Sequence, residues 1–454
     1  MAGDNPLDAR SDRGSTGFLT AGSRDLEQAE RLVEEALLAG AEEAEVYLKS
    51  STTTSIILKG GFSTLAGGSE RGLALRVFDG KGCMGHAFAS WSGPEVGHRV
   101  VSHAMASLEA SSSPPIVPRH PAPRPSEPFA DIAGVLDAEV LESGPAEKRA
   151  SIETGMRQAH RQAALRLGVA YRDGVSRVVI ANSRGLQASF SRTLALLTLT
   201  LSGAGRPTLY AEAAACGLRQ DSIRDNTENL LRLDGSEPER EIRPEILLLE
   251  SSAATGLVRW IEREVFTDPE SLSSPERFRR IASETVEVVD DPWLPGGLAS
   301  GPFDGEGHPT APVKTVKAGI PVARLGDGKS ALGDSGHSVR ASYRDLPAPG
   351  GSNLLILGGR RSREEILHGV EAGLFVAALE SDSRGEHRER EACWRGIGWR
   401  IRNGRLEGAC HGFLFRAAPG LLLSRILEVS RDVRFSLRGT TALGSPDLLI
   451  RLEE

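Results

Sequence analysis

Two β-strands joined by a turn are predicted by GLALRVFDGKGCMGHAFAS, residues 72–90. Apolar side chains recur at every second position on both sides of the Asp79–Gly80 pair, and this period of two is typical of a half-buried strand. Asp-Gly is a common hairpin turn. Segments 45–50 and 54–61 show the same alternation, so this part of the chain predicts an antiparallel set of strands.

Amphipathic helices are predicted on either side of these strands. Residues 23–38 repeat apolar side chains with helical spacing and stop before Gly40, and residues 94–108 show the same spacing. The region 23–110 is therefore predicted to be an N-terminal α+β domain. The polar, Gly/Ser/Asp-rich stretch 1–22 before it is predicted to be a disordered tail.

A proline-rich segment at residues 111–130 separates this domain from the next. So many prolines exclude a helix or a central strand, which leaves a semi-rigid linker or a connection wrapped over the surface. A long amphipathic helix at 145–168 and a run of strand candidates at 169–217 follow. Residues 131–240 are therefore predicted to form a helix and an antiparallel meander.

The remaining chain, residues 241–454, predicts a β-rich C-terminal domain. A buried strand at 246–249 runs into a helix at 252–266, and the chain then becomes rich in glycine and short strands. Further helices are predicted at 362–373 and 420–432. The fold class is therefore α+β, with antiparallel strands and long helices in the N-terminal part and mainly β-structure after it.

Composition excludes several classes of protein. The net charge of −7 and the absence of a basic cluster argue against a nucleic-acid-binding protein. No apolar run approaches the roughly 20 residues of a membrane span, and no signal peptide is recognisable, so we expect a cytoplasmic protein without membrane contact. The four cysteines form no CxxC pair, so we expect reduced, mostly buried thiols.

One motif could bind a metal ion. In FDGEGHPT, residues 303–310, Asp304, Glu306 and His308 occupy alternate positions and would share one face of an extended chain. Two carboxylates and an imidazole suit a divalent cation. The intervening glycines instead indicate a tight turn in which the carboxylates accept backbone N–H groups.

The order of several segments resembles the TldD/PmbA family. The resemblance covers roughly residues 27 to 454 and is carried by AEEAEVYLKSSTTTSIILKGG (41–61), ERGLALRVFDGKGCMGHAFAS (70–90), VVIANSRG (178–185), DDPWLPG (290–296), FDGEGHPT (303–310), SALGDSGHSVR (330–340), GSNLLILGGRRSREEILHGVEAGLFV (351–376) and WRGIGWRIRNGRLEGAC (394–410). Each segment alone is a weak signal, but the ordered set is specific.

The resemblance implies one of two kinds of subunit. TldD-like subunits carry an HExxxH zinc motif and a later cysteine ligand, whereas PmbA/TldE-like subunits lack them and pair with the first kind in a peptidase that cuts unfolded or modified peptides. The motif would lie on the helix at 252–266, which contains no histidine. The resemblance therefore implies a zinc-less subunit, with zinc in a TldD-like partner and no catalytic or metal-binding residue of its own.

Two histidine-containing stretches resemble metal motifs without their chemistry. HRVVSH (98–103) spaces two histidines correctly, but Arg99 stands where the glutamate base is needed. Cys410–His411 occurs late in the chain, without histidine partners on the helix. Both pairs are interpreted as structural or surface residues. Because the FDGEGHPT pattern occurs in family subunits of both kinds, Asp304, Glu306 and His308 are interpreted as loop-fixing or chamber-lining residues.

Two alternatives to the zinc-less subunit remain open. The chain could be a self-sufficient, diverged metallopeptidase that uses Asp304, Glu306 and His308. It could also be a homo-oligomeric peptide-binding protein without catalysis, in which case a homodimer replaces the TldD-like partner. All three hypotheses share a peptide ligand.

Overall fold

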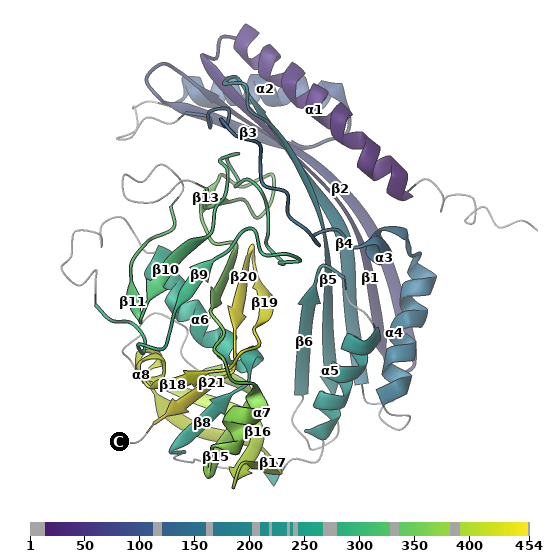
Figure 1. The fold of residues 1–454 in the computed structure, drawn as a ribbon. Helices are drawn as coiled ribbons and strands as arrows, with labels where there is room; N and C mark the ends of the chain where they lie inside the picture. Colours follow the sequence, from purple (N-terminus) through teal and green to yellow (C-terminus); the bar gives the residue numbers. More distant parts are fainter. Residues whose placement is uncertain are drawn as a thin grey trace, which may run out of the picture.

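The computed structural model describes residues 14–111, 120–159, 167–201, 209–217, 220–233, 237–238, 244–266, 279–326, 336–381 and 391–452. Within these ranges the chain forms an N-terminal half on one long, curved sheet and a C-terminal half on two further sheets (Figure 1). The prediction of an α+β fold is confirmed.

The long sheet has six strands in the order β3-β2-β1-β4-β5-β6, and all neighbours are antiparallel. Its strands are β1 (Glu43–Lys59), β2 (Phe62–Phe78), β3 (Met84–Ser90), β4 (Leu167–Asn182), β5 (Gln187–Leu201) and β6 (Leu209–Ala215). β1 and β2 pair along their whole length, and a two-residue turn at Gly60 and Gly61 joins them. Both glycines have positive φ, which suits this turn.

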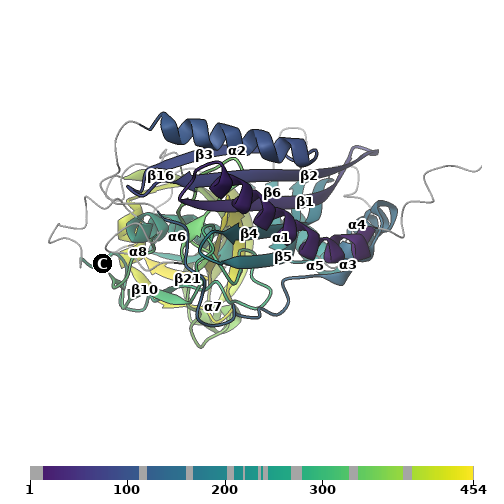
Figure 2. The same cartoon turned by 90° about the horizontal axis from the view of Figure 1, so that it is seen from above.

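Five helices of the N-terminal half cover one face of this sheet: α1 (Gly14–Leu38), α2 (Pro94–Glu109), α3 (Ala138–Glu142), α4 (Pro145–Ala159) and α5 (Gln220–Arg232). Side chains alternate along a strand, so Val46, Leu48 and Ile56 of β1 all point to this face and are buried under helices. Figures 1 and 2 show α1 and α2 along the outer side of the long strands. The other, concave face is left for the C-terminal half.

Strand β1 runs through a stretch where the sequence predicted a break. The predicted segments 45–50 and 54–61 are one continuous strand, because residues 51–55 pair with β2 and β4 without interruption. These serines and threonines do not alternate in polarity, and they are exposed or half-exposed. Gly174 of β4 lies so close to Thr52 of β1 that a Cβ would meet the Thr52 carbonyl oxygen at 2.1 Å.

The C-terminal half contains two larger sheets and a two-stranded ribbon. The six-stranded sheet has the order β11 (Ile320–Pro321), β10 (Val313–Lys317), β9 (Val288–Asp290), β14 (Asn353–Ile356), β20 (Thr441–Ser445) and β19 (Arg434–Arg438). The seven-stranded sheet has the order β18 (Ile426–Val429), β21 (Leu448–Arg451), β8 (Ile246–Leu249), β15 (Ala372–Ser381), β16 (Ala392–Arg402), β17 (Arg405–Ala417) and β7 (Glu237–Pro238). The ribbon pairs β12 (Ser338–Val339) with β13 (Ala348–Pro349).

Helix α6 (Ser251–Phe266) packs between these two sheets, and its Leu257, Val258 and Ile261 are fully buried in their common core. Two short helices, α7 (Arg363–His368) and α8 (Pro419–Ser424), complete the half. In the part of the chain that the structure describes, no helix combines the length and apolar character that crossing a membrane requires.

The helix predicted at 420–432 is wrong in its second half. The chain leaves α8 after Ser424 and enters β18, which pairs antiparallel with β21. Ile426 and Val429 are buried by this pairing. A helical repeat of apolar residues was therefore overridden by a tertiary strand partner.

Strands on both sides of the proline-rich segment share the long sheet, so the ranges 23–110 and 131–240 contribute to one structural unit. Residues 112–119 lie outside the described part of the chain. After them the chain wraps over the concave face, where Ala122 is buried and its carbonyl accepts a hydrogen bond from Asn182.

Helix α1 begins at Gly14, so residues 14–22 are helical rather than a tail.

Candidate functional site

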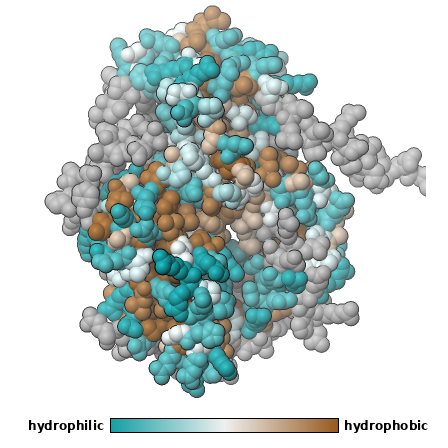
Figure 3. All heavy atoms as spheres, in the orientation of Figure 1, coloured by the Kyte–Doolittle hydropathy of each residue, from teal (hydrophilic) through white to brown (hydrophobic). Residues whose placement is uncertain are grey.

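A cleft of about 2040 Å³ lies between the two halves of the described chain. One wall is formed by β5, β6 and α5, and the other by β15, β16, β17, β19 and the start of α6. In the space-filling view apolar residues gather around the middle of the molecule, between its upper and lower parts (Figure 3). A cavity of this size is large enough for a peptide segment.

The N-terminal wall follows from the alternation of β5. Leu197 and Leu199 are buried under the helices, whereas Leu196 and Thr198 point the opposite way and line the cleft. Beyond β5 lies β6, the last strand of the sheet, whose Glu212 also lines the cleft. Within the described residues, the cleft therefore meets the edge strand β6 and the concave face of the sheet beside it.

The C-terminal wall contains a charged cluster at the start of α6. Arg363 donates from Nε to Asp447 Oδ2 at 2.7 Å and from Nη2 to Glu250 Oε1 at 3.0 Å. Burial lowers the pKa of Arg363, but these carboxylates outweigh it and raise the pKa well above its ordinary value. Asp447 Oδ1 also accepts the backbone N–H and the hydroxyl of Ser251, which fixes the first residue of the helix.

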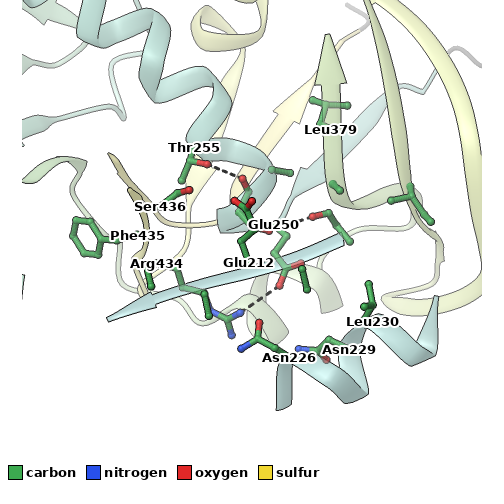
Figure 4. Close-up of a pocket in the computed structure, with 18 of the residues that line it drawn as sticks. Glu212, Asn226, Asn229, Leu230, Glu250, Thr255, Leu379, Arg434, Phe435 and Ser436 are labelled. Atoms are coloured by element: carbon green, nitrogen blue, oxygen red, sulfur yellow. Dashed lines mark hydrogen bonds and ion pairs between the residues drawn. The ribbon is translucent and has the colours of Figure 1, made fainter. Parts of the chain in front are cut away.

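Two longer charge contacts also lie in the cleft, and one of them joins its two walls (Figure 4). Arg434 Nη1 of β19 lies 3.6 Å from Glu250 Oε1, and Arg438 Nη1 of the same strand lies 3.5 Å from Glu212 Oε2 of β6. Asn226 and Asn229 of α5 add polar groups beside Glu212. The cleft thus combines apolar surface with charged and amide groups from both halves.

The FDGEGHPT loop lies away from the lining of this cleft. Asp304 Oδ1 accepts backbone N–H groups of Glu306 and His308 at 2.8 and 3.0 Å, and its Oδ2 accepts that of Ser338 at 3.1 Å. Burial raises the pKa of Asp304 to about 6, although the charge of His308 and the backbone hydrogen bonds lower it. These contacts fix the turn.

Glu306 belongs to a buried ion network between the two halves. Its Oε1 accepts from Arg76 Nη1 at 2.8 Å, and Arg76 also donates to both oxygens of Glu45 at 3.0 and 2.6 Å. Arg340 Nη2 donates to Glu45 Oε1 at 2.6 Å. Two arginines and two glutamates therefore balance in charge where the C-terminal half meets β1 and β2.

Comparisons with known proteins agree with this architecture. Residues 248–452 match the family model for the PmbA/TldA metallopeptidase C-terminal domain. A metalloprotease from Methanothermobacter thermautotrophicus is 23% identical over 363 residues, which cover 74% of this chain and 76% of that protein. The C-terminal part of the chain, residues 248–452, therefore belongs to the PmbA/TldA metallopeptidase family.

Solved structures show that the family fold extends over almost the whole chain. TldE from Thermococcus kodakarensis matches with a TM-score of 0.78 at 17% identity and covers 93% of this chain and 98% of its own. A proposed modulator of DNA gyrase from Thermotoga maritima matches with a TM-score of 0.77 at 19% identity and covers 94% and 98%. At these identities the likeness concerns the fold alone.

The residues present do not fit the zinc ion of the TldD/PmbA family. Helix α6, where the resemblance places the zinc motif, contains no histidine, and its Trp260 packs against Arg263 instead. Among the described residues, no three His, Cys, Asp or Glu side chains converge in a way that could hold a metal ion. We therefore derive no metal chemistry from this chain.

In the described structure, neither HRVVSH (98–103) nor Cys410–His411 is arranged to bind a metal ion. His98 is exposed on α2, with its Nδ1 2.5 Å from Glu35 Oε1. Cys410 is fully buried in the C-terminal core, while His411 lines the cleft. Of the four cysteines, Cys393 is half-buried and the others are buried.

Sequence reasoning missed the charged residues of the cleft. Glu250 directly follows the buried strand β8 and precedes a helix, a position where polar side chains often lie at a functional edge. Arg434 and Arg438 alternate with Phe435 and Leu437 in RFSLR, which is a strand pattern with two basic residues on one face. Neither sequence pattern shows which strand lies on the opposite wall of the cleft.

Proposed function

We propose that this chain is the zinc-less subunit of a TldD/TldE-like peptidase complex. It encloses and positions unfolded or modified peptides, and a zinc-bearing TldD-like partner carries out hydrolysis. The chain alone would bind peptide without cutting it. A cytoplasmic complex that matures or degrades peptides follows from the same proposal.

The observation that carries the proposal is the composition of α6. The family match at residues 248–452 includes the whole of this helix, yet the helix lacks the histidine ligands of a zinc peptidase. The cleft beside the start of α6 has a volume of about 2040 Å³. A chain with a peptide-sized cleft and no metal ligands on this helix suits a role in binding.

The cleft offers two ways to hold an extended peptide. Strands β6 and β19 are each the last strand of their sheet, and residues of both line the cleft. A free strand edge binds a peptide backbone through main-chain hydrogen bonds, which makes binding tolerant of sequence. Leu196, Leu379 and Phe435 add apolar surface for side chains of the peptide.

Affinity purification of the tagged chain from its native lysate tests the proposal. We expect a stoichiometric partner that carries HExxxH, identified by mass spectrometry and by a defined mass in light scattering. Recovery of this chain only as a homo-oligomer would contradict the pairing and favour a peptide-binding protein without catalysis.

A further inference from the structure

Strand β19 presents two arginines to the cleft from one face. Arg434, Ser436 and Arg438 alternate with Phe435 and Leu437, so the three polar side chains share a side of the strand. All five residues line the cleft. Figure 4 shows Arg434 and Ser436 on β19 near Glu250 and Glu212, which come from other elements.

The carboxylates near these arginines hold them only weakly. Glu250 is already bound by Arg363 at 3.0 Å, which leaves Arg434 a contact of 3.6 Å. Arg438 meets Glu212 at 3.5 Å. The side chains of Arg434 and Arg438 are 58% and 49% exposed, and long, exposed ion pairs of this kind contribute little to stability. Both guanidinium groups can therefore bind another carboxylate.

We propose that Arg434 and Arg438 form a subsite that selects acidic side chains of an extended peptide. The proposal rests on the proposed function, because it names a specificity of the same cleft. Four residues of a strand span about 13 Å, so carboxylates at positions i and i+4 of an extended peptide match the two guanidinium groups. Opposite charges directly across a strand pair are favourable.

Glu212 would compete with the peptide for Arg438. A peptide carboxylate that binds Arg438 must displace a contact 3.5 Å long between β19 and β6. Removing the Glu212 charge should therefore strengthen the binding of acidic peptides, whereas removing the Arg438 charge should weaken it. A general effect of net charge would have the same signs, so the loss at Arg438→Gln has to be compared with Arg431→Gln, which removes an equal charge outside the cleft.

The test compares three labelled nine-residue peptides by fluorescence anisotropy with the full-length protein. The first carries Glu at i and i+4, the second carries Gln at both positions, and the third carries Glu at i and i+3, which point to opposite sides of a strand. We expect the first peptide to bind at least tenfold more tightly than the other two at low salt. The preference should shrink in 0.5 M NaCl.

Variants then assign the preference to the two arginines. Arg434→Gln and Arg438→Gln should each reduce it several-fold, the double variant should abolish it, and Glu212→Gln should increase it. Arg431→Gln is the matched control, because Arg431 is exposed beside β19 and pairs with Asp432 outside the cleft. Its peptide affinities should equal those of the unmodified protein.

Three results would overturn the proposal. Equal affinities for the Glu and Gln peptides would exclude the subsite but leave the proposed function intact. An acidic preference that survives in the double arginine variant would place the selectivity elsewhere. No binding of any peptide would reject both the subsite and the proposed role in holding peptides.

Discussion

Arg340 Nη2 lies 2.6 Å from Glu45 Oε1, although 295 positions separate the two residues along the chain. Glu45 belongs to β1 and Arg340 follows β12, so this contact joins the long sheet to the C-terminal half. Arg76 and Glu306 complete the buried network. The network therefore fixes how the two halves meet, at a place outside the lining of the cleft.

Substitution Glu45→Gln should destabilise the protein by about 3–5 kcal/mol, because it leaves two buried guanidinium groups with one carboxylate. Urea denaturation followed by circular dichroism measures the free energy of unfolding. Glu70→Gln is the control, since Glu70 pairs with Arg344 at 3.3 Å and both side chains are more than half exposed. A change of about 0.5 kcal/mol or less is expected there. Similar losses for both variants would argue against a special role of the network.

Substitution Gly72→Ala should displace Tyr343 and loosen the contact between the halves. The Tyr343 ring lies against Gly72, where a Cβ would meet its Cδ1 at 2.0 Å. Its hydroxyl bonds Ser90 Oγ at 2.9 Å. We expect a loss of about 1–3 kcal/mol in thermal or urea unfolding. Gly67→Ala on the same strand is the control, because its added Cβ would meet no atom closer than 3.7 Å. A loss of stability in Gly67→Ala as large as that in Gly72→Ala would contradict the account.

The pKa of Asp304 predicts a pH dependence of stability. Burial raises this pKa from 3.8 to about 6, so between these values the folded state holds a proton that the unfolded state has released. The free energy of unfolding should therefore fall as pH rises from about 4 to about 6, by about 3 kcal/mol relative to Asp304→Asn. Above about pH 6 the difference between the two proteins should be constant.

Urea unfolding of both proteins at several pH values measures this difference. Thr64→Ala provides the control, because Thr64 is exposed on β2 and its side chain carries no titratable group. The difference in unfolding free energy between Thr64→Ala and the unmodified protein should not vary over the same pH range. If the unfolding free energy of the unmodified protein, relative to that of Asp304→Asn, rose with pH, the pKa of Asp304 in the folded state would be lowered instead.

Filling the cleft should weaken peptide binding without unfolding the chain. Thr198 of β5 lines the cleft, and Thr198→Trp places a large side chain there. We expect the Kd for an extended, unfolded peptide to rise at least tenfold, which corresponds to about 1.4 kcal/mol. Thr64→Trp adds the same side chain at an exposed position of β2 outside the cleft lining, and its Kd should not change. Equal effects of both variants would place the peptide elsewhere.

The sequence supports most of the N-terminal fold, because its strands and helices have strong periodicity. Alternation along 72–90 identifies β2 and β3, and helical spacing identifies α2. The Ser/Thr residues 51–55 obscured the continuity of β1, since these positions are exposed or half-exposed and need no apolar side chains. At residues 426–429 the sequence pattern is helical, but pairing with β21 produces a strand instead.

The candidate site was harder to predict than the fold. Asp304, Glu306 and His308 stood out because they alternate with glycines, but the ion partner of Glu306, Arg76, comes from the other half of the chain. The cleft residues Glu212, Glu250 and Arg434 come from three distant segments that only the tertiary structure brings together. A motif search examines neighbours in sequence and therefore finds the turn rather than the cleft.

The most direct test of the central claim is hydrolysis of an unfolded reporter peptide by the purified chain, alone and with an HExxxH-bearing family member from the same organism. We predict that the chain alone binds the peptide without cutting it. Hydrolysis should begin when the second protein is added, and it should be lost when the histidines of that protein's motif are replaced by alanine. Hydrolysis by this chain alone, at a rate that the second protein does not change, would contradict the account.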